Sequence, residues 1–360
     1  MLYWIIFSIF ILILLWCSIL CKNTACYTNK VAYLFITLVS GFRYMIGGDY
    51  SEYINMYYDA DILVLKAYPE ISFTIISVLL KYFGLSYQCL FLVYTLIISI
   101  FFYKGLTYYI KNPQIIGIAI GLYYSSLFVG YWESMNTIRQ MAAVMVCFYG
   151  TRFLLKKNLK KYFLWVIVAI FLHYSAIISL LAPIMTRLQL SKKVCFGIMS
   201  VSIISIKFHF VDIFYYFFSL TGRGLSYIGK LNEFPGTNLG FILLLFIYLF
   251  CLLLYQNNDN IQRINFTLYT WGIIFYILFL PTAHLSRFSF FFLIHMYVTI
   301  AYVLYYKISP RLFILGVLLL SNILFLFKLS TIPNNENLIN NVRESANNIE
   351  YQINIKLFDS

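Results

Sequence analysis

Apolar runs long enough to cross a lipid bilayer recur along all 360 residues of the chain. A membrane-spanning helix needs about 20 predominantly apolar residues, with its backbone groups bonded within the helix. The sequence is 62% hydrophobic and only 11% charged, and it leaves no polar stretch large enough for a soluble catalytic domain. We therefore predict an all-α, polytopic integral membrane helical bundle with about 10–12 membrane segments.

About eleven of these runs are candidate spans. The first, Leu2–Leu20, lacks the basic start and the small-residue cleavage site of a signal peptide, so we expect it to be retained. The shorter run Ile71–Phe83 carries Lys81 and favours a re-entrant or interfacial helix. We expect a membrane domain over residues 1–328 and a polar, Asn-rich tail over 329–360. The candidate spans are Leu2–Leu20, Val31–Ile46, Tyr87–Tyr103, Ile115–Tyr131, Ile138–Leu155, Tyr162–Met185, Val194–Phe210, Leu239–Tyr255, Ile264–Leu280, Phe288–Tyr306 and Leu312–Phe327.

The basic residues indicate how this bundle is oriented. Short loops rich in Lys and Arg face the cytoplasm, and placing the basic loops there collects more than half of the basic residues inside and all acidic residues except Asp259 outside. Basic clusters flank both ends of Tyr162–Met185, which is too short for two full crossings, so we expect a broken hairpin near His173. The outer face then carries the long loops 43–70 and 211–238.

The net charge of +13 does not indicate a nucleic-acid partner, because the basic residues lie in short loops between spans. Membrane topology explains this excess of basic residues, and we expect the protein to be surrounded by membrane lipid. The seven cysteines are scattered, mostly inside apolar runs. We therefore predict no disulfide framework, no metal site and no cofactor.

The segment Gly41–Tyr53, GFRYMIGGDYSEY, places Arg43, Asp49 and Glu52 at the mouth of an apolar run. Charges near lipid are costly and usually mark a functional site. Gly48 and the glycine before it let the backbone leave helical geometry, so the charged side chains can turn into a cavity lined by protein. The sequence therefore predicts a site here.

Four arginines on the expected outer side lie beside or within apolar segments. A guanidinium binds phosphate oxygens in a bidentate manner and stays charged when partly desolvated, so a converging set would hold a pyrophosphate. Each arginine could instead pair with a nearby acid, as Arg43 with Asp49, or extend to the membrane interface. The four are Arg43, Arg139, Arg223 and Arg287.

Polar residues also interrupt two later apolar runs. Asn136, Arg139 and Gln140 are spaced i, i+3 and i+4, so on one helix they share a face, either as a site or as a polar contact between helices. His173 stands in AIFLHYSAII with no charge within ten residues on either side. It is either a proton acceptor or a hydrogen-bond donor in the cavity, or a packed core histidine. His284, in PTAHLSRF, has a weaker case.

Five segments resemble, in order and spacing, the EpsG family of Wzy-type exopolysaccharide and O-antigen polymerases: FRYMIGGDYSEY, NTIRQMAAV, KKNLKKY, AIFLHYSAII and HLSRFSFFF. The resemblance implies a glycosyltransferase of the bacterial plasma (inner) membrane with its active site facing the periplasm or cell exterior. It would transfer a growing glycan from undecaprenyl pyrophosphate onto the non-reducing end of the next lipid-linked oligosaccharide repeat unit. It implies no cofactor and leaves a chain-length regulator protein open as a partner.

The resemblance carries over by position Arg43, Gly48, Asp49, Tyr53, Arg139, Gln140, His173 and Arg287, although the family pattern often has one glycine where this chain has Gly47-Gly48. Donor chemistry agrees, since a glycosyl pyrophosphate needs its developing charge neutralised and the acceptor hydroxyl deprotonated. We favour His173 over Asp49 as the base, because an imidazole titrates near neutral pH. The expected catalytic residues are His173, Asp49, Arg139 and Arg287; the expected substrate-binding residues are Arg43, Gly48, Glu52, Tyr53, Asn136, Gln140, Arg223 and His284.

Two other classes of membrane protein remain as alternatives. A flippase or transporter for lipid-linked oligosaccharides should show an internal repeat and central charges facing both halves, and neither is clear in this sequence. A polytopic acyltransferase that modifies surface sugars usually has an arginine and histidine pair in its first spans, whereas Arg43 has no histidine nearby. Conversion of lipid-linked repeat units into a ladder of longer glycans would distinguish a polymerase from both.

Overall fold

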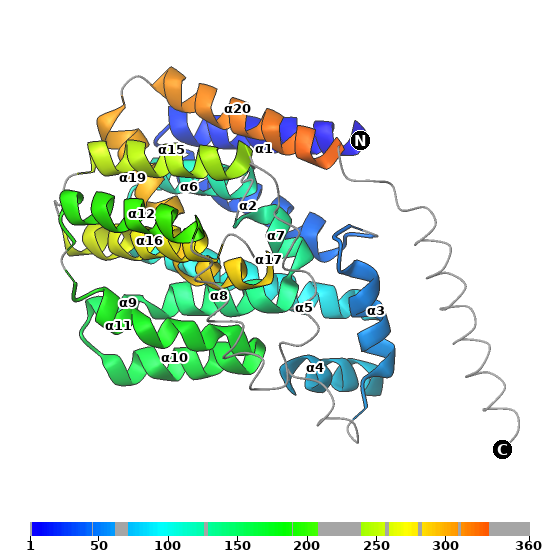
Figure 1. Ribbon diagram of the computed structural model, residues 1–360. Coiled ribbons are helices and arrows are strands. Elements are labelled where there is room, and N and C mark those ends of the chain that lie inside the picture. Colours follow the sequence, from blue (N-terminus) through cyan, green and yellow to red (C-terminus); the bar gives the residue numbers. More distant parts are fainter. Residues whose placement is uncertain are drawn as a thin grey trace, which may run out of the picture.

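The computed structural model describes residues 2–44, 46–61, 71–125, 129–188, 190–207, 239–255, 259–279, 283–308 and 311–330. Every regular element in these ranges is a helix, which confirms the predicted all-α bundle (Figure 1). The α-helices are α1 (Leu2–Leu20), α2 (Ala25–Gly41), α3 (Tyr50–Asp59), α4 (Ile71–Tyr82), α5 (Tyr87–Tyr109), α6 (Pro113–Tyr124), α7 (Tyr131–Asn136), α8 (Ile138–Gly150), α9 (Arg152–Leu155), α10 (Leu159–Leu172), α11 (Ala182–Met185), α12 (Lys192–Lys207), α15 (Leu239–Leu254), α16 (Asn260–Leu278), α17 (Ala283–Ser286), α18 (Phe290–Leu293), α19 (Met296–Lys307) and α20 (Arg311–Ser330), and two 3-10 helices are η2 (Tyr174–Leu181) and η3 (Arg287–Ser289).

Helix α8 lies at the centre of the bundle, and all of its residues except Arg139 are buried. It packs against α5 on one side and α10 on another. Gly105 of α5 permits this approach, since a Cβ at that position would lie 2.5 Å from the ring of Phe148. A helix that is apolar on every side belongs in a core. Arg139 is therefore the residue through which α8 reaches partly accessible space.

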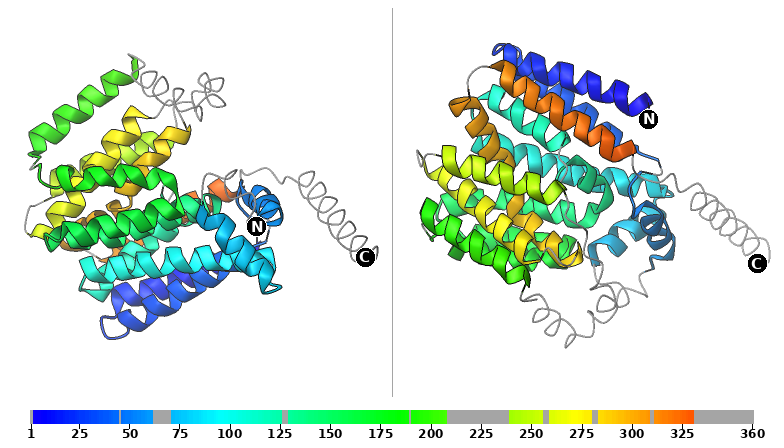
Figure 2. Two further views of the ribbon diagram at one scale, coloured as in Figure 1. Left: turned by 90° about the horizontal axis from the view of Figure 1, so that it is seen from below. Right: turned by 45° about the horizontal axis from the view of Figure 1, so that its top comes forward.

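Two further groups of helices flank this centre. Helices α2, α6 and α20 pack against α1, and α12, α18 and α19 pack against α16. The first and last described helices, α1 and α20, lie side by side although they are far apart in sequence (Figure 1, Figure 2). Most long helices run in one general direction, horizontal in Figure 1. Loops from distant parts of the chain therefore gather at the two ends of the bundle.

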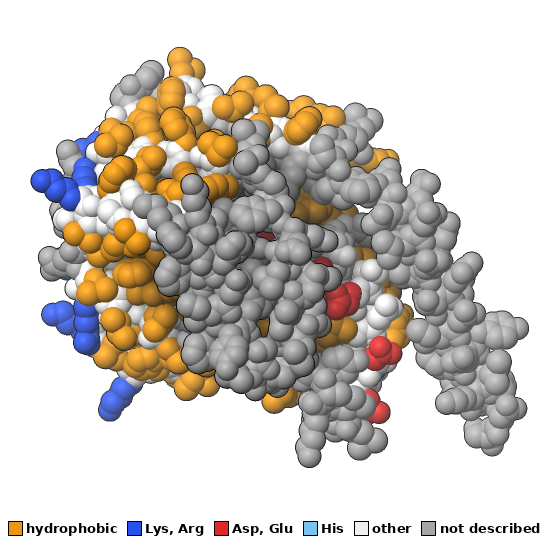
Figure 3. Space-filling model, in the orientation of Figure 1, with side chains coloured by type: hydrophobic (Ala, Val, Ile, Leu, Met, Phe, Trp, Pro, Cys, Tyr) orange, Lys and Arg blue, Asp and Glu red, His pale blue; other side chains and the backbone are white. Residues whose placement is uncertain are grey.

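The flank of the bundle is apolar, as a lipid-facing surface requires. Leu253 is 76% exposed and Val201 is 66% exposed, and Figure 3 shows apolar side chains spread over this side. Soluble proteins rarely expose such contiguous apolar area. The same figure shows Lys and Arg at the left end and Asp and Glu toward the right. The molecule is an integral membrane protein with oppositely charged ends.

Helix lengths differ from the expected spans. Among the described residues, two helices are by themselves long and apolar enough to cross a membrane, Tyr3–Leu20 and Tyr87–Tyr109. A third results if Arg287–Leu293 and Met296–Lys307, which meet at 43°, form one bent span. Shorter apolar helices also belong to the bundle: Ile71–Tyr82, Pro113–Tyr124, Tyr174–Met185, Phe241–Leu254 and Arg311–Phe327.

Local sequence explains why some expected segments are shorter. The run expected over Ile115–Tyr131 is helical only to Tyr124, as α6, which begins at a Pro113 whose missing N–H suits a first helical position. The run expected over Ile138–Leu155 divides at Thr151 into α8 and α9. The loop 211–238 and residues 331–360 of the expected tail lie outside the described residues.

The broken hairpin expected within Tyr162–Met185 is confirmed. Helix α10 ends at Leu172, His173 is extended (φ −157°, ψ 124°), and η2 returns along α10. The imidazole stabilises the break, because His173 Nδ1 accepts a hydrogen bond from the backbone N–H of Ser175 at 3.3 Å. The hairpin thus presents His173 at one end of the bundle and both of its termini at the other.

The close contact of α16 with α18 depends on Gly272. A Cβ there would lie 2.6 Å from the backbone nitrogen of Leu293 and 2.9 Å from the carbonyl carbon of Phe292, and backbone atoms cannot rotate away. We expect Gly272→Ala to destabilise the protein by about 1–3 kcal/mol through overpacking. Gly316→Ala is the matched control, since no atom lies within 4 Å of a Cβ at that position. Equal thermal midpoints for the two variants in detergent would contradict this packing.

Candidate active site

Four polar residues from separate parts of the chain meet at the end of the bundle that carries the hairpin break. Asp49 precedes α3, Arg139 lies in the first turn of α8, His173 follows α10 and Arg287 begins η3. Asp49 interacts electrostatically with Arg287 and Arg139, and His173 interacts with the same two arginines. All four side chains are half-buried. These are the four residues expected from the sequence to be catalytic.

Gln140 connects the hairpin break to η3. Its Nε2 donates to Ser175 Oγ and to the backbone carbonyl of Arg287, each at 3.2 Å. Ser175 Oγ in turn lies 2.6 Å from His173 Nδ1. Gln140 is expected from the sequence to bind substrate, but in the structure it holds together the two segments that carry His173 and Arg287.

These hydrogen bonds determine the tautomer of His173. The backbone N–H of Ser175 points at Nδ1, so that nitrogen is an acceptor. Ser175 Oγ accepts from Gln140, and with Nδ1 as an acceptor the hydroxyl is the donor of the 2.6 Å contact with Nδ1. In the neutral imidazole the remaining proton then resides on Nε2. His173 is thus arranged to donate a hydrogen bond through Nε2 rather than to receive a proton there.

Asn136 anchors the loop that carries Asp49. Its Oδ1 accepts hydrogen bonds from the backbone N–H of Gly48 at 2.7 Å and from that of Asp49 at 3.3 Å. Gly47 has φ +111°, a conformation that favours glycine, and a Cβ there would lie 2.9 Å from the carbonyl oxygen of Met135. The Gly47-Gly48 pair therefore lets the loop lie directly on the end of α7.

Arg43 also contributes to this loop rather than to the open site. The residue is only 2% exposed, and its guanidinium donates to the carbonyls of Ser40 at 2.7 Å, Met135 at 3.0 Å and Ile46 at 3.2 Å. It lies 4.5 Å from the centroid of the Phe91 ring. Backbone carbonyls and an aromatic ring thus surround the Arg43 guanidinium, whereas the sequence suggested Asp49 as its partner.

Aromatic rings support the Arg139 side chain. Its guanidinium lies 5.3 Å from the ring centroid of Tyr53 and 5.4 Å from that of Phe73. Such cation–π contacts stabilise a cation without using its hydrogen-bond donors. Tyr53, a predicted substrate-binding residue, is 3% exposed and acts here as one wall of the arginine site. Glu52 is exposed in the first turn of α3.

The expected single helix through Asn136, Arg139 and Gln140 is wrong. Helix α7 ends at Asn136, and Thr137 has φ −106° and ψ 61°, so α8 begins anew at Ile138. The hydroxyl of Thr137 donates to the carbonyl of Glu133 at 3.2 Å, a local side-chain bond of the kind that competes with helix continuation. The break lets Asn136 face the loop while Arg139 and Gln140 face the hairpin.

Two further residues were predicted to bind substrate. Arg223 lies outside the described residues, and His284 is placed by its backbone in α17, just before Arg287. The sequence analysis did not single out Ser175 or Glu133. Glu133 interacts electrostatically with Tyr276 of α16. The signal for Ser175 was its position two residues after His173, where a side-chain hydroxyl commonly bonds a neighbouring group.

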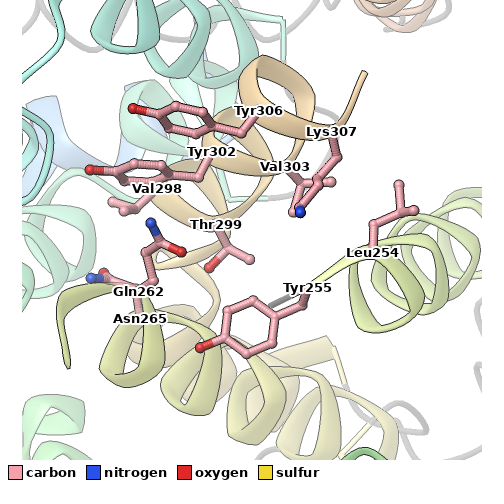
Figure 4. A pocket seen from close by; sticks show the side chains of 10 residues that line it. All are labelled: Leu254, Tyr255, Gln262, Asn265, Val298, Thr299, Tyr302, Val303, Tyr306 and Lys307. Atoms are coloured by element: carbon pink, nitrogen blue, oxygen red, sulfur yellow. The ribbon is translucent and has the colours of Figure 1, made fainter. Parts of the chain in front are cut away.

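No cluster of three or more His, Cys, Asp or Glu that could hold a metal occurs among the described residues. A cavity of about 260 Å³ lined by Tyr255, Gln262, Tyr302 and Lys307 (Figure 4) belongs to the other end of the bundle. It lies at the start of α16, whereas Arg287 follows the end of that helix, about 28 Å away for 19 residues. The charged cluster, not this cavity, is the candidate active site.

The role of Asn136 can be tested separately from any activity. Asn136→Ala removes the acceptor for two loop amides, each worth about 0.5–1.5 kcal/mol, so hydrogen exchange at Gly48 and Asp49 should accelerate about two- to tenfold. Asn112→Ala removes a comparable amide acceptor, the cap of α6 that binds Gln114 N–H, and should leave the exchange of these two amides unchanged. Equal exchange in both variants would remove Asn136 as the loop anchor.

Searches among curated proteins and among solved structures returned no match. A comparison with protein-family models matched residues 27–342, which include the Gly47-Gly48 loop, α8, the hairpin and η3. The match covers most of the chain, and the protein belongs to the EpsG family.

Proposed function

We propose that this protein is a polysaccharide polymerase that joins undecaprenyl-pyrophosphate-linked oligosaccharide repeat units. The growing glycan is transferred from its lipid pyrophosphate onto the non-reducing end of the next unit. Membership of the EpsG family supports a polymerase-like function in general. The observation that carries the finer proposal is the convergence of Arg139 and Arg287 with Asp49 and His173 at one end of an apolar bundle.

Arg139 and Arg287 bind the donor pyrophosphate in this proposal. The reaction breaks the bond between the anomeric carbon and the pyrophosphate oxygen, so negative charge develops on the leaving group. Two guanidinium groups stabilise that charge most in the transition state, where electrostatic catalysis is effective. The rings of Tyr53 and Phe73 support the guanidinium of Arg139, and this side chain extends from helix α8 rather than from a loop. The apolar flank accommodates the polyprenyl chain.

Asp49 is the group that we assign as the base. Burial raises the pKa of its carboxyl above the usual value, and Arg287 and Arg139 oppose this only in part. The carboxylate is therefore more basic than an exposed aspartate, while the adjacent cations favour its ionised form. It accepts the proton of the acceptor hydroxyl as that oxygen bonds to the anomeric carbon. Undecaprenyl pyrophosphate departs.

His173, which the sequence favoured as the base, has a different role in this proposal. Its Nδ1 is occupied by Ser175 N–H and Oγ–H, and its Nε2 carries the proton. We assign Nε2–H as a hydrogen-bond donor to the pyrophosphate or to the acceptor sugar. Ser175 and Gln140 hold the tautomer, as a second group commonly does for a catalytic histidine.

The site faces the periplasm or cell exterior in this proposal. Basic loops gather at the opposite end of the molecule (Figure 3), and such loops are retained in the cytoplasm. The protein would therefore act in the bacterial plasma membrane on repeat units already displayed outside, for O-antigen, capsule or other exopolysaccharide synthesis. A chain-length regulator would be its partner.

The arginine roles predict a failure of polymerisation without a failure of insertion. Arg139→Lys and Arg287→Lys keep the charge but lose the planar fork, so the rate should fall about ten- to a hundredfold, equivalent to about 1.5–3 kcal/mol. The assay is purified protein in liposomes with lipid-linked repeat units, read as a glycan ladder on a gel. Lys160→Gln, an exposed cation at the far end, is the control. Wild-type ladders from both arginine variants would refute the clamp.

The two acid–base candidates differ in their expected pH dependence. Because the Asp49 carboxyl must be ionised, wild-type rate should fall as pH decreases through its raised pKa, and Asp49→Asn should be inactive at every pH. His173→Gln should lower the rate but keep the same acidic limb. Should His173→Gln lose the acidic limb while Asp49→Asn still makes polymer, the base is His173.

A further inference from the structure

A second cavity, of about 370 Å³, lies at the opposite end of the bundle from the candidate active site. It forms where both termini of the hairpin, at residues 154–159 and 183–187, meet the start of α16 at residues 260–264. Helix α10 leads from this cavity to His173, about 21 Å over its 14 residues. The cavity is therefore separate from the site for polymerisation.

The charges around this cavity are of one sign. Lys157, Arg187 and Arg263 line it, and none of the described residues that line it is acidic. Asp259 lies nearby but is exposed, and its Oδ1 accepts from the N–H of Gln262 at 2.7 Å as the cap of α16. Three cations from three segments thus surround one space without an acid among its lining residues.

Arg263 has an unmet hydrogen-bonding requirement at this cavity. Its Nε is buried and has no hydrogen-bond partner within the described part of the chain. A buried N–H of this kind is normally paired, since leaving it unpaired is costly. Arg263 also lines the cavity, and an anionic oxygen bound there would match the fork geometry of its guanidinium.

Lys157 adds a second, independent indication. Among the described residues it is the non-glycine residue with positive φ, at +54°. The N–H of Asn158 donates to the carbonyl of Phe153 at 2.8 Å, and that of Lys157 to the carbonyl of Leu154 at 3.0 Å. This helix-ending pattern usually takes glycine. A lysine in the strained position keeps a cation at the mouth of the cavity.

We propose that this cavity binds the phosphate of an anionic membrane lipid. Half of its lining is apolar and suits acyl chains, and the large neighbouring side chains of Ile184 and Leu188 are 61% and 45% exposed. Basic pockets between helices are a recognised form of lipid headgroup site. The bound phosphate joins both termini of the hairpin to α16. The apolar lining residues are Leu154, Leu155, Leu159, Pro183 and Ile264.

Native mass spectrometry of the full chain, titrated with phosphatidylglycerol or phosphatidylcholine, tests this site. Wild type should retain one phosphatidylglycerol in preference to phosphatidylcholine, and Arg263→Gln should bind it about tenfold or more weakly. Lys160→Gln removes an exposed cation of the same end that does not line the cavity and should bind as wild type does. Equal retention by Arg263→Gln and Lys160→Gln would overturn the proposal.

Lys157→Gly separates lipid binding from folding. It removes the cation but relieves the backbone, so its thermal midpoint in phosphatidylcholine should not fall, while the stabilisation by phosphatidylglycerol should diminish. Full stabilisation of this variant by phosphatidylglycerol would count against the site. Inorganic pyrophosphate forms the last arm. If it stabilises wild type but not Arg263→Gln, and phosphatidylglycerol stabilises neither, the cavity takes a soluble phosphate and the lipid assignment is wrong.

Discussion

The hydrogen bonds of Gln140 hold the arrangement on which the candidate site depends. Gln140 is 5% exposed in α8, a helix in which all residues except Arg139 are buried, and its amide contacts both the hairpin break and η3. Neither segment is a regular α-helix, so neither has a continuous ladder of its own to fix it. A single amide from the central helix therefore positions His173 and Arg287 relative to Arg139, the preceding residue of the same helix.

The loop before α3 is fixed by the same device from the other side. Asn136 and Arg43 bind backbone groups, not each other's side chains, and both contacts involve the short helix α7. Backbone contacts of this kind define the path of a loop independently of its side chains. Asp49 can therefore be held near two arginines although its own burial disfavours ionisation. The loop before α3, the hairpin break and η3 are thus each held in place by hydrogen bonds to α7 or α8.

Sequence reasoning reached the fold class and the hairpin because both follow from strong, simple constraints. Apolar length dictates a helical membrane body, and basic clusters on both sides of Tyr162–Met185 require the chain to return. The four residues predicted to be catalytic could also be singled out, since charged and imidazole groups are rare in such a chain, and the structure brings them together. The roles of Arg43, Asn136 and Gln140 were not predictable, because carbonyl and amide contacts between distant segments leave no pattern in one sequence. The helix break at Thr137 was not predictable either, because the i, i+3, i+4 spacing places residues on one face only if the helix is continuous.

The two ends of the hairpin obtain their cations in different ways. At His173, the segment η2 carries no charged residue of its own, and the arginines come from α8 and η3, so the cations are brought to the break by packing. At the other end, Lys157 and Arg187 belong to the hairpin's own termini and are exposed. Basic termini keep that end in the interface and resist movement of the hairpin through the membrane. The break at His173 can therefore be polar without displacing the hairpin. The basic termini fix the position of the hairpin in the membrane, and they lie at the end opposite the proposed chemistry.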